Sequence, residues 1–141
     1  MNQSRCTRYW TCLVMAGMLL SATTTRPANF TVSTSSELET ALNAARANGQ
    51  NDVIDLLPGI YPTTSLSEGF KYYGTNENFS LTMQCTNGLA TLDGQGGVRV
   101  LIMKTLGGNA HIILSGLEIK NGYITDPDLG AGLNIWGTRP M

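Results

Sequence analysis

From residue 50 onward the chain is a succession of short β-like runs, each closed by glycine or asparagine, with no helical periodicity between them. The runs are Ser80 to Cys85, Ala90 to Asp93, Val98 to Met103, His111 to Ser115, Leu117 to Lys120, and Leu133 to Trp136. Short strands joined by tight turns, without intervening helices, favour a solenoid in which successive turns of the chain stack on one another.

Alternation within these runs assigns their side chains to two faces. Leu81, Met83 and Cys85 share one side of their run, and Glu118 and Lys120 point away from the apolar side of theirs. Leu81, Met83 and Cys85 are therefore predicted to lie inside, where Cys85 serves as a small buried hydrophobe rather than a nucleophile.

Three types of strand are predicted to repeat once per turn of the solenoid, and the glycine pattern sets their register. The predicted stacking is Leu81–Cys85 below Ile112–Leu114, Ala90–Asp93 below Leu117–Lys120, and Val100–Ile102 below Leu133–Ile135. In this register Leu92 meets Ile119 inside, and Asp93 meets Lys120 outside. A slip of one residue would bury Glu118 and Lys120, which is too costly without partners.

One segment is predicted to be helical, from Ser36 to Asn48. Ser36 and Glu39 have the spacing of a capping box, and Gly49 supplies the stop. The apolar stripe comprises Leu38, Ala41, Leu42 and Ala45. After the helix, Asp52 to Leu57 reads as a strand that ends at Pro58-Gly59, and the polar stretch from Thr63 to Asn78 is predicted to be a long loop.

The first 25 residues have the order of a secretory signal peptide. Arg5 and Arg8 precede an uncharged, mostly apolar run from Trp10 to Leu20, and small and polar residues follow. The run is too short to span a bilayer comfortably. We therefore expect residues 1–25 to be removed on export, leaving a mature chain without a transmembrane segment that is secreted, periplasmic or at the cell surface, most simply in a bacterium. Its one remaining cysteine, Cys85, cannot form an internal disulfide.

Two stretches carry a resemblance to a known family. They are Pro58-Gly59-Ile60-Tyr61 and the run from Ile112 to Gly122, IILSGLEIKNG. With the glycine-rich entry Gly130-Ala131-Gly132-Leu133, they resemble the right-handed parallel β-helix repeat proteins of the pectate-lyase-like superfamily. The resemblance covers about Phe30 to Gly137 and implies an all-β solenoid whose N-terminal helix caps the first coil. Its motifs are specific for the fold and say little about activity.

The signal-peptide pattern and the resemblance together predict a domain organisation. We expect residues 1–25 to be the signal peptide and residues 26–141 to be the N-terminal cap and first coils of a β-helix domain. Because the sequence stops one strand into a new coil, at Met141, we expect a truncated product or fragment.

Few residues of the sequence are candidates for a catalytic, metal-binding or ligand-binding role. Asp126 and Asp128 flank a proline and are weak candidate calcium ligands, because no further acid lies nearby and a proline-containing turn is the simpler interpretation. No other cofactor is indicated. Neither Asp93 nor His111 has a second catalytic residue at a characteristic spacing in the sequence. The simpler interpretation is that Asp93 belongs to a turn and that His111 lies at the end of a strand. Trp136 is predicted to point outward, opposite Leu133 and Ile135, where it could stack on a sugar or face a further loop or coil.

Composition narrows the function further. Charged residues make up 13% of the chain, and lysine and arginine are sparse and unclustered, which excludes a nucleic-acid binder. Two hypotheses are left. The first is a secreted or cell-surface β-helix protein that is structural or adhesive, or that interacts with polysaccharide or a cell-surface glycan. The second is a polysaccharide lyase or glycoside hydrolase whose catalytic coils lie beyond Met141, since no catalytic constellation is recognisable in this chain.

Overall fold

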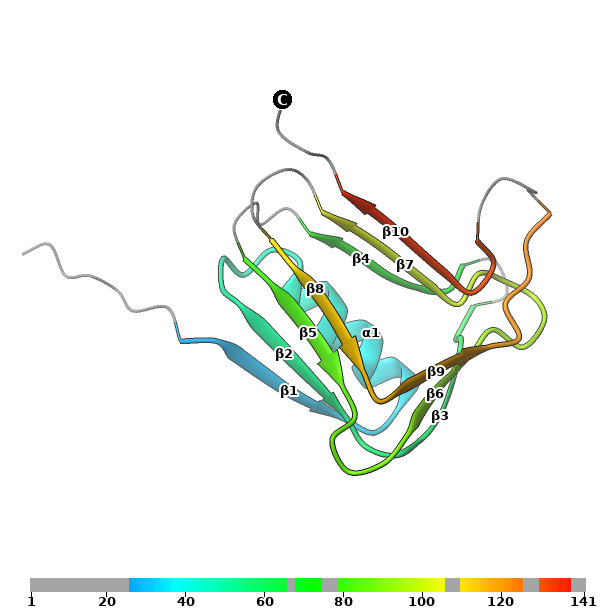
Figure 1. Ribbon diagram of the computed structural model, residues 1–141, viewed down its shortest axis with the longest axis horizontal. Helices are drawn as coiled ribbons and strands as arrows, with labels where there is room; N and C mark the ends of the chain where they lie inside the picture. The colour runs from blue at the N-terminus through cyan, green and yellow to red at the C-terminus, as the bar shows by residue number, and fades with distance from the viewer. Residues whose placement is uncertain (1–25, 66–67, 75–78, 106–109, 126–129, 138–141) are drawn as a thin grey trace, which may run out of the picture.

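The computed structural model describes residues 26–65, 68–74, 79–105, 110–125 and 130–137. In this part the chain forms one helix and ten strands (Figure 1). The elements are β1 (Ala28–Val32), α1 (Ser35–Ala45), β2 (Asp52–Leu56), β3 (Gly59–Pro62), β4 (Phe70–Gly74), β5 (Leu81–Gln84), β6 (Ala90–Asp93), β7 (Leu101–Thr105), β8 (Ile112–Ser115), β9 (Leu117–Lys120) and β10 (Leu133–Gly137). The protein is therefore mostly β.

The strands form three sheets in which every pairing is parallel. The strand orders are β1-β2-β5-β8, β3-β6-β9 and β4-β7-β10. The chain enters the sheets in the same sequence three times, as β2-β3-β4, β5-β6-β7 and β8-β9-β10 (Figure 1). Each strand consequently pairs with the strand three places earlier or later, apart from β1, which extends the first sheet beyond β2.

Two of the three predicted registers are confirmed and one is wrong. Leu81 pairs with Ile112, and Leu92 pairs with Ile119, as alternation predicts. In the third sheet, Leu133 pairs with Leu101 rather than with Val100. The strand begins later than predicted because Val100 and Leu101 are both fully buried, so the alternation breaks where the chain enters β7.

The helix is present, but it is capped two residues earlier than predicted. Thr34 is the N-cap, and its hydroxyl accepts a hydrogen bond of 3.2 Å from the amide of Glu37. The Glu37 carboxylate accepts in return from the backbone amides of Ser33, at 2.7 Å, and Thr34, at 3.1 Å. The Ser33 amide is the main cause that lowers the pKa of Glu37. The predicted stripe is buried, and α1 packs against β1, β2 and β4.

A single apolar interior joins the helix to all three sheets. Its fully buried side chains include Ile54, Met83, Leu92 and Met103, one or more from each sheet. Tyr61 is also buried, and its hydroxyl donates toward the carbonyl oxygens of Val32, at 2.9 Å, and Leu57, at 2.8 Å. Because Val32 ends β1 and Leu57 follows β2, this phenol ties β3 to the first sheet.

Asp52 is a buried acid at the start of β2, with 2% of its surface exposed. Its Oδ1 accepts a hydrogen bond of 2.6 Å from the side-chain amide of Asn48. Burial raises the pKa of Asp52, and the Asn48 bond offsets this only in part. The Asp52 carboxyl group therefore holds its proton more readily in the folded chain than in the unfolded chain.

The raised pKa of Asp52 predicts how an Asp52→Asn variant behaves. The contribution of the protonated acid is fully present below the ordinary aspartate pKa and is lost as the pH rises through the raised value. At pH 7 the variant is expected to be more stable than the parent, by on the order of 1 kcal/mol. The difference should shrink as the pH falls toward 3. Urea unfolding of both proteins between pH 3 and 8 measures this, and a pH-independent difference would contradict the prediction.

Candidate functional site

The outer face of the β4-β7-β10 sheet carries exposed aromatic side chains and partly exposed lysine side chains. Alternation separates this face from the interior, because Phe70, Tyr72, Leu101 and Met103 are all buried in the core. The residues between them point outward. They are Lys71 and Tyr73 on β4, Ile102 and Lys104 on β7, and Asn134 and Trp136 on β10, although Asn134 is buried, with 7% of its surface exposed.

Strand register aligns three of these residues in a row across the sheet. Tyr73 pairs with Lys104, and Lys104 pairs with Trp136. Tyr73 is 42% exposed and Trp136 is 50% exposed. Since neighbouring strands lie about 4.8 Å apart, the two aromatic residues are separated by roughly 10 Å with a lysine between them. We call Tyr73, Lys104 and Trp136 the aromatic row.

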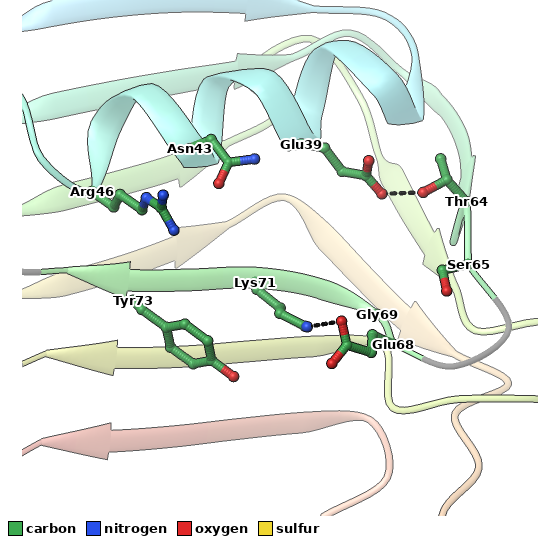
Figure 2. A pocket seen from close by; sticks show the side chains of 9 residues that line it. All are labelled: Glu39, Asn43, Arg46, Thr64, Ser65, Glu68, Gly69, Lys71 and Tyr73. Carbon is green, nitrogen blue, oxygen red and sulfur yellow. Dashed lines mark hydrogen bonds and ion pairs between the residues drawn. The ribbon is translucent and has the colours of Figure 1, made fainter.

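A polar cleft of about 410 Å³ opens beside the aromatic row, between α1 and β4. Figure 2 shows Glu39, Asn43 and Arg46 of the helix on one side and Lys71 and Tyr73 of the strand on the other. Tyr73 thus belongs to both the row and the cleft. The remaining lining residues are Thr64, Ser65, Glu68 and Gly69.

The two carboxylates of the cleft are each engaged by a neighbour. The Thr64 hydroxyl donates to Glu39, and the Lys71 ammonium forms an ion pair with Glu68 (Figure 2). A glycosidase needs a carboxylate pair, one to donate a proton and one to act as base or nucleophile. Carboxylates held by a hydroxyl and by a lysine are better suited to shaping a polar binding surface.

A second cleft of about 300 Å³ lies farther along the same face. It is lined by Glu68 and Gly69, which it shares with the first cleft, and by Gly97, Val98, Arg99, Ile102, Tyr123, Ile124 and Thr125. Arg99 is fixed there by a hydrogen bond of 2.7 Å from its Nε to the carbonyl of Gly130. The two clefts and the aromatic row give this face aromatic rings, cations and hydrogen-bonding groups in one continuous area.

Of the site residues predicted from sequence, Trp136 alone belongs to this face. Asp126 and Asp128, the candidate calcium ligands, lie outside the described residues. Among the residues that are described, no three histidine, cysteine or acidic side chains are grouped so as to hold a metal ion.

The contacts of Asp93 and Cys85 in the structure are those of residues that stabilise the fold. Asp93 accepts hydrogen bonds from the amide of Gln95, at 2.8 Å, and from the side chain of Asn121, at 2.9 Å. These bonds, the Gln95 amide first, lower the pKa of Asp93 and hold a turn. Cys85 is buried, as predicted, and His111 is exposed just before β8.

Sequence reasoning missed the part of the site supplied by β4 and α1. The sequence predicts a long loop from Thr63 to Asn78, and this prediction is wrong for Phe70–Gly74, which form β4 and carry Lys71 and Tyr73. The signal was the aromatic run Phe70-Lys71-Tyr72-Tyr73, whose alternation is typical of a strand.

Comparisons of the chain with protein-family models, with curated proteins and with solved structures found no match. In the portion of the chain that the structure describes, no helix is both long and apolar enough to cross a membrane. The geometry of the outer face is therefore the basis for a functional proposal.

Proposed function

We propose that this chain is an exported protein, built as a right-handed parallel β-helix, that binds glycans through the outer face of β4, β7 and β10 in a structural or adhesive role. Three all-parallel sheets entered repeatedly in one order, around one apolar interior, support the β-helix. The order of cationic, apolar and small residues in positions 1–25 supports export to the periplasm, the cell surface or the medium.

The aromatic row is the observation that carries the glycan proposal. A sugar ring has an apolar C–H face that packs on an aromatic ring and an edge of hydroxyls that needs hydrogen-bonding partners. Tyr73 and Trp136 supply two exposed rings that face the same side of one sheet, and Lys104 supplies a donor between them. Two rings roughly 10 Å apart suit an extended chain of sugars better than a single small ligand.

The cleft beside the row supports binding rather than cleavage. Its polar residues are donors and acceptors of the kind that orient a ligand in a binding site. Glu39 and Glu68, the carboxylates at hand for acid–base chemistry, are engaged by Thr64 and Lys71. We therefore prefer the adhesive role to that of a lyase or hydrolase.

Substitutions in the aromatic row test this function. Trp136→Ala and Tyr73→Ala are each expected to weaken polysaccharide binding about tenfold, because each removes one stacking surface worth about 1–1.5 kcal/mol. Affinity electrophoresis and calorimetry against a panel of neutral and acidic polysaccharides would measure it. Ile60→Ala is the control, since Ile60 is 66% exposed on β3 in another sheet. The proposal fails if the parent binds none of the panel, or if all three variants bind like the parent.

A further inference from the structure

The second cleft, of about 300 Å³, lies where the chain approaches the β4-β7-β10 sheet in successive turns. Three segments supply most of its lining. They are residues 68–69, before β4, residues 97–99, before β7, and residues 123–125, after β9. The amide of Phe70 donates to the carbonyl of Val100 at 2.9 Å, which joins the first segment to the second. The amide of Tyr123 donates to the carbonyl of Val98, also at 2.9 Å. Backbone hydrogen bonds therefore fix the walls of this cleft.

Arg99 gives the second cleft a donor that is still available. Its Nε donates to the carbonyl oxygen of Gly130, and this bond fixes the direction of the side chain. Its Nη2 is buried and has no hydrogen-bond partner among the residues that the structure describes. Glu68 also lines the cleft, but its carboxylate forms an ion pair with Lys71. Because a guanidinium N–H removed from water is strongly stabilised by an acceptor oxygen, Nη2 is the group that a ligand oxygen can engage.

The side chains around Arg99 are largely apolar. We call Val98, Ile102 and Ile124, which line the cleft, the apolar wall. A carboxylate would match the charge of Arg99, but beside the apolar wall it would lose hydration without gaining enough donors. An acetamido group matches both features, because its carbonyl oxygen accepts a hydrogen bond and its methyl group packs on aliphatic side chains. The hydroxyl of Thr125, also in the lining, can accept from the acetamido N–H.

The second cleft is adjacent to the aromatic row. Ile102 and Lys104 lie two residues apart on β7 and point to the same outer face. This spacing corresponds to about 7 Å along the strand. Tyr123, which is 54% exposed, adds a further aromatic ring at the cleft. A glycan chain that lies on the row can therefore place a ring substituent in the cleft while Tyr123 contacts a neighbouring sugar.

We propose that the second cleft binds the acetamido group of an N-acetylated amino sugar, with the carbonyl oxygen on Nη2 of Arg99 and the methyl group against the apolar wall. This inference rests on the proposed function, since the aromatic row holds the glycan chain. It narrows the ligand to glycans that contain N-acetylated amino sugars, and it makes Arg99 the residue that distinguishes them from other glycans.

Two tetrasaccharides that differ only in the substituent at C2 test this specificity. Calorimetry of the purified chain should show about tenfold tighter binding of β1,4-linked tetra-N-acetylglucosamine than of β1,4-linked tetraglucose. Tetraglucosamine, which carries ammonium groups in place of the acetamido groups, should bind more weakly than the acetylated form, because Arg99 repels a cation.

Variants of Arg99 and Ile102 show whether this cleft is responsible. Arg99→Met removes the donor, and the ratio of the two dissociation constants should fall from about ten to about one. Because this change also removes the bond to Gly130, Ile102→Ala provides a second variant, at a partly exposed position of β7. It should lower the ratio about threefold by reducing the contact with the methyl group. Ile60→Ala, on β3 in another sheet, is the matched control and should leave the ratio unchanged. Circular dichroism melting checks that each variant is folded.

The outcomes separate this inference from the proposed function. Equal affinity for the acetylated and the plain tetrasaccharide would overturn the acetamido site, as would a preference that survives both Arg99→Met and Ile102→Ala. Tighter binding of tetragalacturonate than of tetra-N-acetylglucosamine, lost in Arg99→Met, would show that the cleft takes a carboxylate instead. In each of these cases glycan binding by the aromatic row stands or falls separately, on Trp136→Ala and Tyr73→Ala. A parent chain that binds none of these tetrasaccharides and no polysaccharide overturns both proposals.

Discussion

Replacing Leu92 with alanine is expected to lower the free energy of unfolding by about 2–5 kcal/mol. Leu92 is fully buried on β6, where it is paired with Tyr61 of β3 below and Ile119 of β9 above. Both neighbours are held by the backbone pairing of their strands, so they cannot collapse into the space that the side chain leaves. The loss of stability is therefore the sum of two terms, the transfer free energy of the removed atoms and the cost of the cavity.

Leu89 provides a control for this variant, three residues away. It is 53% exposed in the turn before β6, so Leu89→Ala should change stability by no more than about 0.5 kcal/mol. Urea titrations followed by circular dichroism would compare the two variants with the parent. Similar losses for Leu89 and Leu92 would mean that the interior does not run through β6 as described.

The structure changes the expectation for a third leucine, Leu114. Alternation places it inside, and the sequence alone predicts that a charge there collapses the fold. It does continue the apolar column, opposite Met83, but β8 is an edge strand and Leu114 is only partly covered. A charge at Leu114 should therefore destabilise the fold less than a charge at Leu92, which is fully buried.

The registers predicted from sequence succeeded where a strict period of two continued through a strand. Leu92 and Ile119 pair as expected because each strand alternates without interruption and a slip would bury charge. In the third sheet the pattern Val98-Arg99-Val100 predicts that Leu101 points outward. The chain turns into β7 at this point, so Val100 and Leu101 are both buried and the period is broken. Sequence periodicity cannot locate such a corner.

The start of the helix shows a different limit. Two overlapping segments, Thr34 to Glu37 and Ser36 to Glu39, have the same capping-box spacing. The structure uses the first, because Ser33 and Thr34 both donate to the Glu37 carboxylate. Ser36, the cap of the second segment, lies inside the first turn of α1. The local sequence cannot distinguish the two possible capping boxes, and contacts with the neighbouring residues determine which one begins the helix.

The candidate site was predictable only at Trp136. Its outward direction follows from alternation with Leu133 and Ile135 along one strand. Its neighbours in the site come from β4 and α1, more than sixty residues earlier, and depend on which strands share a sheet. The order β4-β7-β10 is a long-range property, so no local pattern could bring Tyr73 and Trp136 into one row.

Gly116 is a position between two strands where a methyl group should be poorly tolerated. It joins β8 to β9 in a single residue with φ of +65°, a left-handed conformation that costs other residues about 1–2 kcal/mol. A Cβ atom at Gly116 would also overlap the carbonyl oxygen of Cys85, in the turn directly below. That oxygen belongs to the backbone of the preceding layer and cannot move without disturbing β5.

Gly116→Ala is therefore expected to cost about 2–5 kcal/mol, the sum of backbone strain and overpacking. Gly96→Ala separates the two causes, because Gly96 has φ of +70° but no atom within 4 Å of the added carbon. That control should lose only the conformational part, about 1–2 kcal/mol. Thermal and urea unfolding of both variants give the comparison. If Gly96→Ala were as destabilising as Gly116→Ala, the close stacking of the β8–β9 corner on Cys85 would be refuted.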